Sequence, residues 1–179
     1  MKITVIGIGN TLATDDGVGI RAVEQLRSVV TDERVFIAQS ERGGLDLLDL
    51  LEGYSSAVII DAALTETKPP GTISSFSIQK PFTAESLPSL HTIGLGTVLA
   101  FGTAMGIRLP EKVTVYTVEA KDIETFHEAC TPEVEAAARD LANMLVIELQ
   151  RMLADSSATT VDSYEVKQPI LDGISMESV

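Results

Sequence analysis

The sequence has a single cysteine, no tryptophan, few aromatic residues and half as many basic as acidic side chains. With only Cys130, no intrachain disulfide can form, and the chain opens on a strand-like segment instead of a signal peptide, so we expect a reducing cytoplasm. The 13 Lys and Arg residues face 26 Asp and Glu residues, and aromatics make up 4%, which argues against nucleic-acid binding. No apolar run reaches the roughly 20 residues of a membrane span, so we expect no membrane association.

The chain is long enough for one domain with a substantial core, because 45% of its 179 residues are hydrophobic. Strand-like and helix-like periodicities alternate along the chain, which predicts a three-layer α/β/α sandwich around a mostly parallel five-stranded sheet. We place one domain at 1–154 and a low-complexity tail at 155–179, which we expect to be flexible or docked on a partner or another copy. The expected strands are 3–6, 34–39, 57–61, 72–78 and 113–118. We expect the first helix to begin at residue 18, two further helices over 44–51 and 94–106, and a last helix from residue 131 onward.

The first strand runs into a glycine-rich turn, Gly7-Ile8-Gly9-Asn10, that leads to a helix. Such turns often bind nucleotide phosphates. Here the third glycine of the phosphate pattern is replaced by Leu12, and Asp15 and Asp16 stand where a phosphate would lie. This turn therefore favours a cation. The alternative is that one of the two acids only caps the helix, and Asp15 could also support its neighbour.

Two further polar residues are expected at the same edge of the sheet. Asp61 closes the apolar run 57–61, which reads as a central strand buried on both faces, and His91 lies on the loop that leads to the glycine-rich helix. Crossover rules commonly place the first and third strands side by side, which would bring Asp16 and Asp61 together. Two carboxylates and an imidazole suit a divalent transition metal with open coordination positions. Alternatively, Asp61 caps the next segment and His91 is an ordinary loop histidine.

A second cluster, His127 and Cys130, raises the possibility of a thiol nucleophile activated by an imidazole. Their spacing on one turn seldom gives the required geometry, so a structural role beside the last helix is preferred. The Thr131-Pro132-Glu133 stretch predicts the start of that helix, with the threonine hydroxyl as its cap.

Taken together, these motifs resemble the hydrogenase maturation endopeptidases over about the first 150 residues. The tail after Asp155 departs from the family pattern. The resemblance rests on the opening motif Gly7-Ile8-Gly9-Asn10 through Asp15-Asp16-Gly17-Val18-Gly19, on Gly43-Gly44 before a leucine-rich segment, on Val58-Ile59-Ile60-Asp61-Ala62, on His91-Thr92-Ile93-Gly94-Leu95, and on Thr131-Pro132-Glu133-Val134-Glu135.

The resemblance implies an endopeptidase that cuts the precursor of a [NiFe] hydrogenase large subunit near its C-terminus, after nickel has been inserted. It implies that Asp16, Asp61 and His91 contact the nickel ion that the substrate carries. We expect the metal to polarise the scissile carbonyl or a water molecule, with Asp16 or Asp61 as general base. Two other classes stay open: a metal-independent hydrolase in which the two aspartates share a proton, and a non-catalytic nickel- or nucleotide-binding module.

Overall fold

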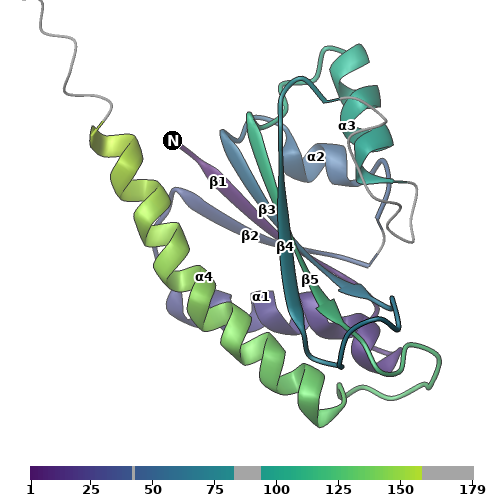
Figure 1. Ribbon diagram of the computed structural model, residues 1–179. Helices are drawn as coiled ribbons and strands as arrows, with labels where there is room; N and C mark the ends of the chain where they lie inside the picture. The colour runs from purple at the N-terminus through teal and green to yellow at the C-terminus, as the bar shows by residue number, and fades with distance from the viewer. Residues whose placement is uncertain (42, 83–93, 159–179) are drawn as a thin grey trace, which may run out of the picture.

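A five-stranded sheet lies between two layers of helices in the computed structural model, which describes residues 1–41, 43–82 and 94–158 (Figure 1). Helices α1 and α4 cover one face of the sheet, and α2 and α3 cover the other. The predicted three-layer sandwich is therefore confirmed. The strands are β1 (Ile3–Ile8), β2 (Val35–Ser40), β3 (Ser56–Ala63), β4 (Ile73–Gln79) and β5 (Lys112–Glu119); the helices are the 3₁₀ turn η1 (Thr14–Gly17), α1 (Val18–Val29), α2 (Leu47–Leu51), α3 (Leu95–Ala104) and α4 (Pro132–Ala158).

The strand order is β2-β1-β3-β5-β4, and β3 lies at the centre of the sheet. Strands β2, β1, β3 and β5 are parallel, whereas β4 pairs antiparallel with β5 at the edge. Strands β1 and β3 are neighbours, with Gly7 opposite Ile60. The carboxyl ends of these two strands thus meet at one edge of the sheet, as the crossover argument predicts.

Burial of β3 on both faces explains its uninterrupted apolar sequence. Val58 and Ile60 belong to the core under α1 and α4, while Ala57 and Ile59 belong to the core under α2 and α3. Side chains alternate between the two faces of a strand, so a strand covered on both sides needs apolar residues at every position. The run ends at Asp61, where the side chain is only partly buried.

Two boundaries differ from those expected from the sequence. Helix α2 begins at Leu47, later than the predicted residue 44, because Gly44 has a φ of +117°, which no helical residue adopts. Helix α4 continues to Ala158, four residues past the predicted domain boundary at 154. The remainder of the predicted tail, residues 159–179, lies outside the described residues, as does His91. Among the helices of the described residues, none is both long and apolar enough to cross a membrane.

Close packing between the first helix and the sheet accounts for two of the glycines in the opening motif. A Cβ atom on Gly19 would lie 2.4 Å from the carbonyl oxygens of both Ile8 and Ile60. Gly9 has a φ of +142°, and a Cβ there would lie 1.8 Å from the carbonyl oxygen of Asp16. These glycines let the start of α1 rest directly on the ends of β1 and β3. They therefore hold Asp16 close to the end of β3.

Candidate active site

Asp16 lies in η1, the turn between the glycine-rich loop and α1, and its side chain is partly buried. Its Oδ2 atom accepts a hydrogen bond of 2.8 Å from the backbone N–H of Asn10. The carboxylate therefore points back towards the loop that follows β1. The N-cap of α1 is Gly17, with no side-chain cap hydrogen bond, so the interpretation of Asp15 or Asp16 as the helix cap is wrong.

Asp61 lies near the end of β3, and its Oδ1 atom accepts a hydrogen bond of 2.9 Å from the N–H of Ala62. The pKa of this carboxyl is raised to about 6, mainly because burial disfavours the charged form. The Ala62 hydrogen bond opposes this rise, and the negative charge of Asp16 adds to it. Asp16 and Asp61 are therefore close enough to interact, which confirms the prediction that this edge brings them together.

Whether His91 joins the two acids is not decided by the described residues, because His91 lies outside them. The described residues contain no group of three histidine, cysteine or acidic side chains arranged to hold a metal. The two carboxylates nevertheless fit a divalent cation. They are hard donors, and a cation would offset the desolvation that raises the pKa of Asp61 as well as the negative charge of Asp16 that adds to it.

Asp15 has a different environment from its neighbour, because its side chain is fully buried and hydrogen-bonded. Its Oδ2 atom accepts bonds from the N–H groups of Lys121 (2.8 Å) and Asp122 (3.1 Å) and from the Thr131 hydroxyl (3.0 Å). Its Oδ1 atom accepts a bond of 2.6 Å from the N–H of Thr131. Asp15 thus fastens the turn that carries Asp16 to residues 121–131, which we call the clamp loop.

Thr14 strengthens the same attachment. Its backbone has a φ of +46°, a left-handed conformation that β-branched residues rarely adopt. The N–H of Thr14 donates to the carbonyl of His127 (3.0 Å), and its hydroxyl donates to the carbonyl of Thr125 (2.6 Å). The thiol of Cys130 donates to the carbonyl of Thr14 (3.4 Å). The clamp loop therefore holds Thr14, two residues before Asp16, in an unfavourable backbone conformation.

The role of the clamp loop could not be predicted from the sequence, because its bonds to Asp15 and Thr14 join segments more than 100 positions apart. A local signal in this segment, Thr131 before Pro132, predicts a helix cap. In the structure the hydroxyl of Thr131 donates to Asp15, and its carbonyl accepts a bond from the N–H of Glu135 (2.8 Å).

The structure contradicts a His127–Cys130 nucleophile. The Nδ1 atom of His127 bonds to the backbone of Ala129, and the thiol of Cys130 faces the carbonyl of Thr14. Burial, with the negative charges of Asp15 and Glu135, raises the pKa of the Cys130 thiol to about 11. The reactive thiolate is therefore scarce at neutral pH. The preferred structural reading of this pair is confirmed.

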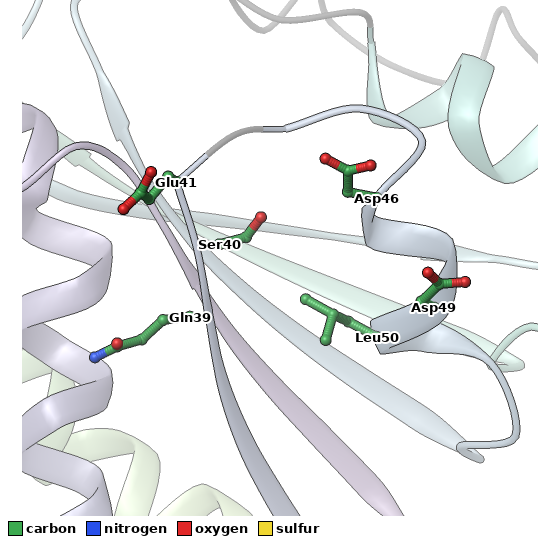
Figure 2. Close-up of a pocket in the computed structure, with 6 residues that line it drawn as sticks. All are labelled: Gln39, Ser40, Glu41, Asp46, Asp49 and Leu50. Carbon is green, nitrogen blue, oxygen red and sulfur yellow. The ribbon is translucent and has the colours of Figure 1, made fainter.

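A separate open cleft of about 530 Å³ lies where β2 ends and α2 begins (Figure 2). It neighbours the loop after β1, since the N–H of Gly9 donates to the carbonyl of Ser40 (3.1 Å). The cleft includes neither Asp16 nor Asp61, so it is distinct from the two-carboxylate site. Its walls are formed by Gln39, Ser40, Glu41, Asp46, Asp49 and Leu50.

Comparisons with known proteins find relatives that match most of this chain. A family model described as hydrogenase maturation protease matches residues 20–148. The Escherichia coli (strain K12) hydrogenase 2 maturation protease is 32% identical over 138 residues, covering 76% of this chain and 83% of the relative. The hydrogenase expression/formation protein HupD of Thiocapsa roseopersicina is 31% identical, covering 99% of this chain and 82% of the relative. The solved structure of the hydrogenase maturating endopeptidase HybD from E. coli superimposes with a TM-score of 0.72 at 29% identity, covering 85% of this chain and 94% of that one.

Proposed function

This chain belongs to the hydrogenase maturation protease family, and we propose that it removes the C-terminal extension of a nickel-loaded [NiFe] hydrogenase large-subunit precursor. Membership of a peptidase family sets aside the non-catalytic nickel- or nucleotide-binding module. The observation that carries the proposal is the meeting of Asp16 and Asp61 at the carboxyl edge of the sheet.

In this proposal the nickel ion belongs to the substrate, and Asp16, Asp61 and His91 contact it there. A bound nickel ion would polarise the scissile carbonyl or a water molecule. The pKa of Asp61, about 6, leaves its carboxyl mostly ionised at pH 7 yet basic enough to accept a proton from water. The N–H of Asn10 holds the carboxylate of Asp16 in place beside it.

The same pair supplies a reason for selecting nickel-loaded precursor. Docking would bury the two acids further, and burial beside a like charge disfavours both ionised forms. A precursor that carries nickel offsets that cost with a cation, whereas an empty precursor does not. We therefore expect the unloaded precursor to dock weakly.

One alternative mechanism draws on the same observation. Asp16 contributes to the raised pKa of Asp61, as expected for two carboxyls that can share a proton in an acid–base dyad. Such a hydrolase would need no metal. Metal dependence therefore separates the two mechanisms.

The test is to incubate the protein with nickel-loaded and nickel-free precursor from the same organism and to compare intact masses before and after. We expect only the loaded precursor to become shorter. Cleavage of both forms at similar rates would favour the metal-independent dyad. If neither form is shortened, the proposed substrate is wrong.

We further propose that the reaction takes place in the cytoplasm, where the unpaired thiol of Cys130 would stay reduced. Association between copies through residues 155–179 stays a prediction.

A further inference from the structure

The clamp loop exposes a large aromatic side chain beside the turn that carries Asp16. Phe126 is 85% exposed, the highest value among the large hydrophobic residues that the structure describes. Leu12, in the loop that leads to Asp16, is 52% exposed. The two segments are joined, since the N–H of His127 donates to the carbonyl of Leu12 (3.1 Å) and Ala13 forms a β-bridge with His127. We call Leu12 and Phe126 the apolar rim.

The backbone that carries the apolar rim is fixed on both sides. Before Phe126, the Oδ1 atom of Asp122 accepts bonds from the N–H groups of Glu124 (3.0 Å) and Thr125 (2.9 Å). After Phe126, the bonds to Leu12, Thr14 and Asp15 described above tie the clamp loop to the turn that carries Asp16, which we call the catalytic turn. An exposed aromatic on a rigid loop loses little conformational freedom when a partner covers it. Aromatic residues of this kind are common binding hot spots.

The position of the apolar rim indicates which partner covers it. Asn10 links Leu12 to Asp16, because its Oδ1 atom accepts a bond from the N–H of Leu12 (3.0 Å) and its own N–H donates to the carboxylate of Asp16 (2.8 Å). A molecule seated on the rim therefore lies next to the turn that carries Asp16. A second copy of the chain seated there would instead cover the turn that has to admit the precursor. The rim is therefore placed to hold the substrate.

We infer that Phe126, with Leu12, anchors an apolar surface of the folded hydrogenase precursor next to the segment to be cleaved. This inference rests on the proposed function and adds the surface by which the substrate is recognised. The contact is apolar, so it operates whether or not the precursor carries nickel. Nickel selection then belongs to Asp16 and Asp61, and precursor selection belongs to the apolar rim.

The test is the cleavage kinetics of nickel-loaded precursor with Phe126→Ser, Leu12→Ser and the double variant. We expect Phe126→Ser to lower kcat/KM about tenfold, through a higher KM, with kcat changed by less than about twofold. The double variant should lower kcat/KM further. Both side chains are largely exposed, so thermal unfolding should match the wild type, which separates a docking effect from misfolding.

Ile147→Ser is the matched control, because Ile147 is 53% exposed on α4. It lies about 22 Å along the helix from Pro132, well away from the catalytic turn. Its kcat/KM should equal that of the wild type. A wild-type KM in the Phe126→Ser variant would overturn the inference, as would a wild-type dimer that this substitution dissociates without changing KM. A wild-type protein that leaves the precursor intact contradicts the proposed function instead.

Discussion

The charge of Asp16 acts on the carboxyl of Asp61, although the two residues come from different crossover units of the sheet. Adjacent parallel strands and the close packing of α1 on their ends bring them together. Burial and this negative charge together disfavour the ionised form of Asp61.

Substitution of Asp61 should change stability in a pH-dependent way. The native pKa of about 6 lies above the ordinary value of 3.8, so between these values the folded state binds more protons than the unfolded state. The free energy of unfolding therefore falls as the pH rises through this interval. Asp61→Asn removes this penalty and should raise the free energy of unfolding by about 2 kcal/mol at pH 7, allowing for partial exposure.

Urea denaturation at pH 7 and pH 4 measures this effect. The gain from Asp61→Asn should largely disappear at pH 4, where the carboxyl is protonated in the folded state and only about half ionised in the unfolded state. Asp49→Asn on α2, an exposed position, should stay close to the wild type at both pH values. If Asp61→Asn destabilises the protein equally at both pH values, the electrostatic explanation is wrong.

Asp15 should matter for stability more than any exposed acid. Asp15→Ala leaves the partly buried N–H groups of Lys121 and Thr131 without their acceptor, which should lower the free energy of unfolding by about 3 kcal/mol. The comparison is Asp32→Ala, which breaks a surface ion pair with Arg34 and should leave the melting temperature unchanged. Equal melting temperatures for the two variants would show that the clamp loop is not held by Asp15.

Gly19, in the first turn of α1, and Gly94, just before α3, should respond differently to an added methyl group. In Gly19→Ala the new Cβ meets backbone oxygens of two strands at 2.4 Å, so we expect a loss of about 3 kcal/mol or failure to fold. Gly94→Ala should cost less than about 0.5 kcal/mol, because no atom of the described residues lies within 4 Å of its added Cβ. Denaturant titration of both variants compares them directly; similar losses would contradict the packing argument.

Cys130 should be dispensable for the reaction. Cys130→Ser keeps a donor for the carbonyl of Thr14, so the precursor should be cleaved within about twofold of the wild-type rate. Treatment of the native protein with iodoacetamide near neutral pH should likewise leave cleavage of the precursor unchanged, because the raised pKa keeps the thiol of Cys130 protonated. Loss of all activity in the serine variant would revive a thiol nucleophile.

Much of this fold follows from local patterns in the sequence. The apolar run that ends at Asp61 identifies a central strand, because only burial on both faces requires apolar residues at successive positions. The same argument, with the preference for right-handed crossovers, correctly brings Asp16 and Asp61 to one edge. Both inferences depend on short-range periodicity and on general topology.

What could not be predicted depends on contacts between distant segments. Asp15 and Asp16 are adjacent and chemically identical, yet one is a buried anchor and the charge of the other acts on Asp61; only the position of the clamp loop distinguishes them. The glycine-rich turn is similarly ambiguous in sequence, since glycine allows either phosphate contact or close packing on a strand. Here Gly19, at the end of the same motif, packs against the backbone of Ile8 and Ile60, so close packing on the strands explains this glycine.

The most direct test of the central claim is the intact mass of nickel-loaded precursor after incubation with the wild type, Asp16→Asn, Asp61→Asn and His91→Ala. The wild type should shorten the precursor, and each variant should be slower by about a hundredfold or more, although Asp61→Asn is expected to be the more stable protein at pH 7. Shortening at the wild-type rate by both aspartate variants would contradict the claim that this pair of carboxylates performs the reaction.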